Sequence, residues 1–234
     1  SEDFTRVLSD WNVDARSIWT IPNWASIEEV PERPKENPWS HAHGIAGRFC
    51  FLYSGTLGMK HNPELLLQLA LNYRDRDEVR VIVVSEGAGA DWLKRKGAEM
   101  GLEGLSVLPF QPYAALPDVL GSADVLLTIL EPEAGVFSVP SKVLSYLCAA
   151  RPLLLAVPQE NLAARTVLEC GAGVVVRPED VQAFLREAEL LRADPARRSL
   201  MGRRARKYAE NNFDLDRITD RFEEVFRAVR EKRR

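Results

Sequence analysis

The sequence predicts an α/β fold in which helices cover both faces of a doubly wound parallel sheet of six strands. Three observations support this class. Six short apolar runs occur between residue 48 and residue 177. These runs are mostly continuous, as is typical of parallel strands buried on both faces. They alternate with segments of helical spacing, and such alternation favours right-handed crossovers and a Rossmann-like sheet.

The first expected strand has the clearest pattern. Residues Phe49–Tyr53 read Phe-Cys-Phe-Leu-Tyr and are followed by a turn with two glycines. Val79–Val84 is likewise followed by small and polar residues, Ser85-Glu86-Gly87. The expected strands are Phe49–Tyr53, Val79–Val84, Leu105–Leu108, Val125–Ile129, Leu153–Val157 and Gly173–Val176.

The segments between the strands have apolar residues at helical spacing. One helix is expected from about Asn62, because Pro63 suits a first turn and leucines follow at the inward positions. Another follows Ser141 and stops at Arg151-Pro152, since a residue before proline leaves the α region. The others are expected over Trp92–Met100, Leu116–Leu120, Leu162–Glu169, Val181–Arg192, Ala196–Asn211 and Leu215–Arg230.

The residues before the first strand of the sheet have a different composition. A short helix is expected over Phe4–Trp11 and a short strand over Ile18–Ile21. Residues 25–47 contain three prolines and mixed charges, which indicates a linker without an element. We therefore expect three parts: a hinge segment over 1–47, the sheet domain over 48–212, and a separate helix over 213–234.

Composition excludes several classes of protein. The net charge of −3 and the pI of about 5.8 argue against nucleic acid as the main partner. Cys50, Cys148 and Cys170 lack CxxC spacing, so we expect reduced core thiols in a cytoplasmic protein, with no disulfide frame and no metal site. No apolar run reaches the length that crosses a bilayer. The chain begins at Ser1 without methionine or a signal peptide, which suggests an excerpt of a longer protein.

Four loops are expected at the carboxyl ends of the strands, where doubly wound sheets bind their ligands. Three of them carry small, amide-exposing or basic residues, as nucleotide sites do. The loops are Ser54–Lys60, Ser85–Gly89, Phe110–Tyr113 and Glu131–Lys142.

The sequence around Lys142 is the most informative of these loops. Ser141 is expected to N-cap the following helix, with Ser138 nearby. Lys142 then lies in the first turn, where the helix dipole disfavours a cation unless an anion is close. An ordinary solvated lysine is the alternative interpretation.

Familiar nucleotide and hydrolase motifs are absent. Gly55 and Gly58 have G-x-x-G spacing, so the dinucleotide fingerprint G-x-G-x-x-G is incomplete. A P-loop and a G-x-S-x-G nucleophile elbow do not occur. The loops therefore indicate another kind of phosphate site.

Five segments together resemble the donor-binding C-terminal half of GT-B glycosyltransferases, specifically the retaining enzymes of family 4. The resemblance covers nearly the whole chain. Its strongest part is similar to the branch that builds bacterial surface polysaccharides. The segments are Ile21–Trp24, Tyr53–Gly58, Val84–Gly87, Val107–Gln111 and Val139–Pro152.

The resemblance implies a set of donor-binding residues. It assigns no catalytic residue in this half and requires no metal or other cofactor. The residues that it implies are Gly55, Thr56, Gly58, Lys60, Glu86, Phe110, Ser138, Ser141, Lys142 and Ser145.

The sequence departs from the family pattern at several of these positions. Thr56 replaces an arginine, and Lys60 and His61 share the place of a lysine. Of the family's E-x7-E pair, the first glutamate falls on Phe137 and the second, which holds ribose, on Ser145. Phe110 and Tyr113 fit base stacking or simple packing of the rim.

The resemblance implies transfer of a sugar, with retention, from a nucleoside diphosphate sugar, with UDP expected, to a polysaccharide or lipid-linked acceptor. In this reading residues 1–47 are the hinge and a remnant of the N-terminal acceptor domain, residues 48–212 bind the nucleotide sugar, and residues 213–234 cross back. This chain alone would be inactive because the acceptor domain is missing. The alternatives are a nucleotide-sugar-binding partner subunit of a two-chain transferase and a GT-B-fold sugar-nucleotide epimerase.

The basic end of the chain bears on where the protein works. Arg230 to Arg234 include four cations and are most simply a solvated helix end. Because acceptors in the resembled family are often lipid-linked, contact with the inner face of the membrane is the alternative. The expected location is the cytoplasm in either case.

Overall fold

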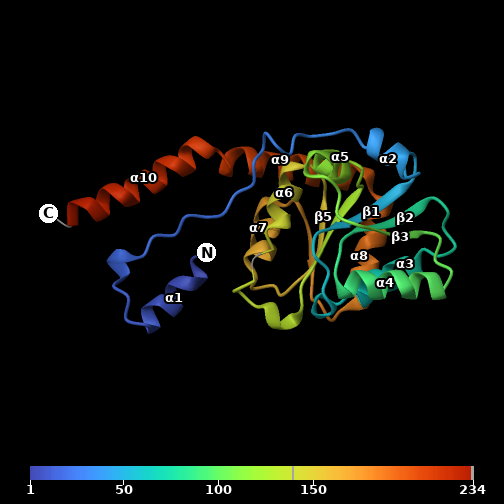
Figure 1. Ribbon diagram of the computed structural model, residues 1–234, viewed down its shortest axis with the longest axis horizontal. Helices are drawn as coiled ribbons and strands as arrows, with labels where there is room; N and C mark the ends of the chain where they lie inside the picture. Colours follow the sequence, from blue (N-terminus) through green and yellow to red (C-terminus); the bar gives the residue numbers. More distant parts are fainter. Residues whose placement is uncertain (139, 233–234) are drawn as a thin grey trace.

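The structure is a computed structural model that describes residues 1–138 and 140–232, without the side chains of Lys60 and Lys232. Its centre is a six-stranded sheet in the order β3-β2-β1-β4-β5-β6, and every pairing is parallel (Figure 1). The predicted fold class is confirmed, as are the positions of all six strands. The strands are β1 Phe49–Ser54, β2 Val79–Val84, β3 Leu105–Leu108, β4 Val125–Ile129, β5 Leu153–Ala156 and β6 Gly173–Val176.

Helices cover both faces of the sheet, because neighbouring residues of one strand point to opposite sides. In β1, Phe51 and Tyr53 join one apolar cluster, whereas Cys50 and Leu52 join the other. The first cluster is covered by α3 Glu64–Asn72, α4 Ala88–Glu99 and α8 Val181–Ala193. The second is covered by α5 Leu116–Gly121, α6 Lys142–Cys148, α7 Leu162–Cys170 and α9 Pro195–Asn212.

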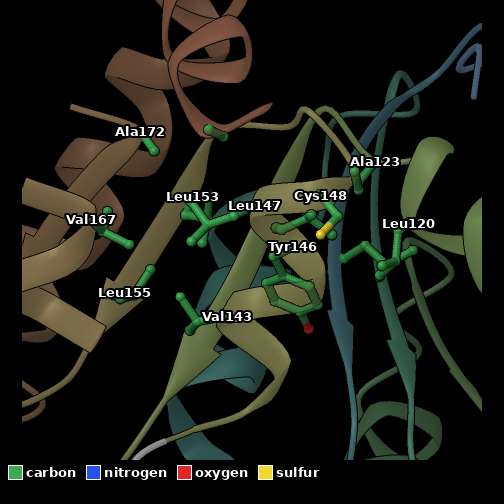
Figure 2. Packing of buried hydrophobic residues seen from close by; sticks show 14 of the residues in the cluster. Leu120, Ala123, Val143, Tyr146, Leu147, Cys148, Leu153, Leu155, Val167 and Ala172 are labelled. Atoms are coloured by element: carbon green, nitrogen blue, oxygen red, sulfur yellow. The ribbon is translucent and has the colours of Figure 1, made fainter. Parts of the chain in front are cut away.

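Helix α6 is fixed to the sheet by its apolar side. Val143, Tyr146 and Leu147 are buried in the same apolar cluster as Leu153 and Leu155 of β5 (Figure 2). Full burial of one large apolar side chain contributes roughly 1.5–3 kcal/mol. The buried side of α6 therefore sets the position of Lys142, the first residue of the helix.

The segment before the sheet corrects two expectations. Helix α1 Asp3–Asp10 is present as predicted, but Ile18–Ile21 forms no strand. Residues 25–47 are not a bare linker, because they contain α2 Pro38–Ala42 and bury Trp39 against the core. The proline pattern is explained by the start of α2, where Asn37 caps the helix and Pro38 occupies its first turn. The domain boundary at residue 48 stays a prediction.

Helix α10 Leu215–Lys232 extends away from the sheet beside the N-terminal segment (Figure 1). Ile218 is buried, but Phe226 is 69% exposed. Phe222 makes an edge contact with Trp24, the ring centroids being 6.2 Å apart. A helix is present where the separate C-terminal helix was expected, whereas its crossing back to a second domain stays a prediction. Arg233 and Arg234 lie outside the described residues.

Two further findings concern features predicted from composition. Cys50 and Cys148 are buried and Cys170 is half-buried, and all three thiols are free. Burial raises the pKa of Cys148 to about 11, so this thiol is unreactive at neutral pH. In the described part of the chain, no helix has both the length and the apolar composition needed to cross a bilayer.

Candidate functional site

A cavity of about 690 Å³ opens at the carboxyl ends of β1 and β4. The strand order reverses between these two strands, and such switch points are where doubly wound sheets bind ligands. The described residues that line it are Trp24, Ala25, Ser26, Val30, Tyr53, Gly55, Thr56, His61, Phe110, Tyr113, Ile129, Leu130, Ser138, Pro140, Ser141, Lys142 and Ser145.

The side chain of Lys142 places an ammonium group in this cavity. Among the described lining side chains it is the one lysine or arginine, and none is a carboxylate. Its ammonium nitrogen lies 3.7 Å from the centroid of the Tyr53 ring. Burial lowers the pKa of Lys142 to about 7, although the ring face partly offsets this by favouring the charged form. A half-buried cation without a carboxylate partner can bind an anion strongly.

A pair of tyrosines holds the loop that faces Lys142. The hydroxyl of Tyr146, on α6, accepts the amide of Ser54 at 2.8 Å and donates to the Ser54 carbonyl at 2.9 Å. The hydroxyl of Tyr53 donates to the carbonyl of Thr56 at 2.8 Å. The end of β1 and the start of α6 are therefore joined through buried hydrogen bonds, which fix the cavity wall.

Gly55 is required by the close approach of Lys142. Its φ is +129°, and a Cβ atom there would lie 2.8 Å from both Cε and Nζ of Lys142. Its amide donates to the carbonyl of Val84 at 3.0 Å, and the amide of Gly58 donates to Nδ1 of His61 at 3.1 Å. Both glycine amides are thus engaged within the protein, and their contact with a phosphate stays a prediction.

The expected N-cap at Ser141 is wrong. Ser141 already has helical dihedrals, φ −56° and ψ −27°, and its side chain makes no capping hydrogen bond. A side chain caps a helix when its own backbone is extended, whereas here the turn already includes Ser141. The amide of Val143 donates to the carbonyl of Pro140 at 3.1 Å, and that of Leu144 to Ser141 at 3.0 Å. These two amides are therefore not available to a ligand.

Two aromatic residues of the loop after β3 also line the cavity. Phe110 and Tyr113 are 47% and 64% exposed, so neither is a core residue. The Tyr113 hydroxyl donates to Glu29 Oε2 at 2.6 Å, which joins this loop to the N-terminal segment. The Phe110 amide donates to Glu86 Oε1 at 3.2 Å. Flat, partly exposed rings in the same cavity as a cation suit a ligand with a planar group and a negative charge.

The structure brings most of the sequence-predicted residues together, but not all. Gly58 and Glu86 do not line the cavity, since Glu86 supports Phe110 from outside it. The side chain of Lys60 lies outside the described residues, and its backbone belongs to η2 Met59–His61. The predicted residues that line the cavity are Gly55, Thr56, Phe110, Ser138, Ser141, Lys142 and Ser145.

Sequence reasoning missed the wall made by the N-terminal segment. Ser26 lines the cavity although it lies in the expected linker over 25–47, and Trp24 lines it although it was expected only in the hinge segment. The signal in the sequence was Trp24 itself, a large aromatic residue directly after Pro22-Asn23. Phe137, the position of a family glutamate, does not line the cavity and instead contacts Phe4, with ring centroids 5.3 Å apart.

The described residues contain no group of three or more histidine, cysteine, aspartate or glutamate side chains that could hold a metal ion. The polar side-chain groups of the described cavity lining are hydroxyls, one indole N–H, one imidazole and one ammonium. These groups suit phosphate and hydroxyl ligands, and they do not resemble the carboxylate sets that bind hard cations.

Two sequence comparisons both relate this chain to glycosyl transferases. Residues 36–208 match the family model described as "Glycosyl transferases group 1". The chain is 27% identical over 217 residues to a protein of Escherichia coli (strain K12) named "Putative colanic acid biosynthesis glycosyl transferase WcaI". That match covers 90% of this chain and 51% of the relative. The chain therefore spans about half the length of this relative.

Solved structures show the same fold at low sequence identity. HepE of Anabaena, in complex with UDP and glucose, matches with a TM-score of 0.80 and 16% identity over 97% of this chain and 62% of that chain. The C-terminal domain of LpcC, a glycosyl transferase group 1 family protein from Francisella tularensis, matches with a TM-score of 0.62 and 12% identity. That match covers 82% of this chain and 99% of that domain. The sheet is thus the Rossmann-like domain of a GT-B fold.

Proposed function

Because this chain belongs to the group 1 glycosyl transferase family, we propose that it is the donor-binding half of a glycosyltransferase. The donor is a nucleoside diphosphate sugar, with UDP as the expected nucleotide. The acceptor is a polysaccharide or a lipid-linked glycan, and the reaction is of the retaining, family 4 type. The observation that carries this proposal is the position of Lys142, a cation without a carboxylate partner in a cavity at the switch point of the sheet.

Lys142 acts on the leaving group in this proposal. When the bond between the sugar and the diphosphate breaks, negative charge grows on the diphosphate. An ammonium already placed in a partly dry cavity stabilises that charge without reorganising. The anion in turn favours the charged form of Lys142, which counters the effect of burial on its pKa.

The remaining groups of the cavity hold the nucleoside. Phe110 and Tyr113 offer partly exposed ring faces on which a base stacks. Ser145 lies one helical turn after Lys142 on the same side of α6 and donates or accepts a hydrogen bond at the ribose. A hydroxyl binds ribose more weakly than the glutamate that the family pattern has at this place.

Three similarities support the proposal. HepE was solved with UDP and glucose and shares the fold. The name of WcaI refers to colanic acid biosynthesis. The C-terminal domain of LpcC is covered almost entirely by this chain, which supports the assignment of these residues to a C-terminal half. In a GT-B enzyme the acceptor binds to the other half, so we expect no transfer by these 234 residues alone.

The test is a calorimetric titration of the chain with UDP, GDP, ADP and CDP, and with uridine as the ligand without phosphate. The proposal predicts that at least one diphosphate, UDP first, binds far more tightly than uridine. A ligand that binds the folded state also raises the melting temperature, which gives an independent readout. The absence of binding by all four diphosphates would contradict the proposal. Sugar transfer by this chain alone would contradict only the expectation that the donor-binding half is inactive by itself.

A further inference from the structure

A second pocket, of about 380 Å³, lies at the opposite edge of the sheet from the candidate site. Ala123 and Asp124 directly precede β4, and Pro152 directly precedes β5, so the pocket is at the amino ends of these strands. We call it the arginine pocket because Arg151, Arg198 and Arg203 all line it. A chain with a net charge of −3 gathers three guanidinium groups here.

None of the three arginines forms an ion pair with a carboxylate in the part of the chain that the structure describes. The carboxylates that line the pocket have other cations. Asp124 pairs with Lys35, and its Oδ2 also accepts the amide of Cys50 at 2.7 Å. Glu32 lies 3.7 Å from Nε of Arg206. The pocket therefore has an excess of positive charge.

Backbone carbonyls hold two of the arginines in place. Nη2 of Arg151 donates to Gly121 O at 2.6 Å and to Arg33 O at 2.8 Å. Nη1 of Arg198 donates to Leu191 O at 2.6 Å and to Arg192 O at 2.8 Å. Groups that are already fixed lose little conformational entropy when a ligand binds.

The described hydrogen bonds engage only part of the guanidinium groups of Arg198 and Arg203, whereas Arg151 donates to backbone carbonyls from Nε, Nη1 and Nη2. Arg198 uses Nη1 for its hydrogen bonds, and its guanidinium carbon lies 4.9 Å from the centroid of the Phe49 ring. Arg203 is exposed and donates from Nη1 to Ser199 Oγ at 2.7 Å. Burial lowers the pKa of Arg151, and the nearby charges of Asp124 and Glu32 partly oppose this shift. Hydrogen bonds to backbone carbonyls explain the positions of Arg151 and Arg198. They do not explain why three arginines without a described ion pair line one pocket.

We propose that the arginine pocket binds a phosphate-bearing anion through Arg151, Arg198 and Arg203. The planar guanidinium fork matches phosphate oxygens in pairs, and three such groups around one pocket suit a phosphoryl or diphosphoryl group. The pocket has the size of a small-molecule site. A soluble phosphorylated metabolite and an anionic lipid headgroup both present this chemistry.

The test uses inorganic pyrophosphate as the probe and a Lys142→Met chain, in which anion binding at the candidate donor site is expected to be weakened. Arg203→Gln is the informative variant because Arg203 holds no backbone carbonyl among its described contacts, so the fold should remain intact. Arg217→Gln is the matched control, since Arg217 is an exposed arginine on α10 far along the chain. Isothermal titration measures the affinity of each chain for pyrophosphate.

We expect pyrophosphate to bind the Lys142→Met chain, and Arg203→Gln to weaken this binding about ten- to a hundredfold, as for a lost charged hydrogen bond. Arg217→Gln should leave it unchanged. If pyrophosphate does not bind, or if both glutamine variants weaken its binding equally, the arginine pocket does not bind a soluble phosphate. Co-sedimentation with phosphatidylglycerol vesicles, against phosphatidylcholine vesicles, tests the lipid source. If the chain binds the anionic vesicles and Arg203→Gln, but not Arg217→Gln, abolishes this binding, the ligand is a lipid headgroup. If neither pyrophosphate binding nor vesicle binding depends on Arg203, the proposal is refuted.

Discussion

The ammonium nitrogen of Lys142 lies 3.7 Å above the ring of Tyr53, where β1 ends and α6 begins. This contact joins the two sides of the switch point of the sheet. The ring shields one side of the cation from water, and the cavity lies on another. The predictions below test how this pair, and the residues that position it, act in the folded protein.

The low pKa of Lys142 predicts proton uptake on diphosphate binding. Burial lowers the pKa of Lys142 from 10.5 to about 7 in the free protein, and a bound anion raises it again. A terminal phosphate with a pKa of about 6 is already ionised at about pH 8.5, so it releases no compensating proton. Titrations with UDP in two buffers of different ionisation enthalpy should report uptake of up to one proton. The Lys142→Met chain should show none.

The same shift predicts the pH dependence of stability. Between the folded value of about 7 and the unfolded value of 10.5, the unfolded chain carries a proton on Lys142 that the folded chain lacks. The contribution of Lys142 to the free energy of unfolding therefore rises with pH across this window. Below it both states are protonated, and the cost of burying the charge is present in full. Urea unfolding of wild type and Lys142→Met from about pH 6.5 to pH 9.5 should show this slope only in the wild type. Parallel curves would contradict the assignment.

Gly55→Ala should affect both stability and binding. The positive φ of +129° strains any other residue, and the added Cβ would meet Cε and Nζ of Lys142. We expect a loss of about 1–3 kcal/mol in the free energy of unfolding and weaker binding of UDP. Gly101→Ala is the control, because its φ is +62° and no atom lies within 4 Å of the added Cβ. It should destabilise the fold but leave UDP affinity unchanged.

Tyr146→Phe should destabilise the chain through Ser54. The variant removes a hydroxyl that bonds both the amide and the carbonyl of Ser54. Leaving such buried groups unpaired costs about 1–3 kcal/mol. Tyr113→Phe removes a hydroxyl from a side chain that is 64% exposed, and it should change stability by less than about 0.5 kcal/mol. Equal effects of the two variants in chemical unfolding would argue against the proposed bracing of the loop.

Helix α10 should contribute to stability only at its start. Ile218 is 6% exposed and Phe226 is 69% exposed. Ile218→Ala should therefore cost about 2 kcal/mol or more, whereas Phe226→Ser should change stability by less than about 0.5 kcal/mol. A large loss of stability with Phe226→Ser would mean that the outer half of α10 packs on the body of the protein in solution.

The sheet could be predicted from the sequence because each strand is a short, nearly continuous apolar run. Burial on both faces demands that pattern, and β1 and β4 show it without a polar interruption outside Thr128. The strand-end loops followed from the topology, since parallel strands place their carboxyl ends together. This is why Gly55, Lys142 and Ser145, which are far apart in sequence, could be expected in one cavity.

The rest of the site depends on interactions that local sequence does not encode. Ser141 has a good capping side chain, but a turn closed by the carbonyl of Pro140 already gives it helical dihedrals. Trp24 lines the cavity because its segment packs on the core through Val30 and Trp39, and a proline-rich composition does not reveal such packing. Glu86 stands at a strand end as expected, yet it accepts the amide of Phe110 outside the cavity.

The most direct test of the proposed function compares Lys142→Met with wild type in titrations with UDP and with uridine. Loss of a charged hydrogen bond of about 1.5–3 kcal/mol should weaken UDP binding roughly ten- to a hundredfold. Uridine affinity should stay the same, because base and ribose bind elsewhere in the cavity. Lys94→Met, at an exposed position of α4, is the control and should change neither affinity. If Lys142→Met binds UDP as tightly as wild type does, the assignment of the diphosphate to Lys142 is wrong.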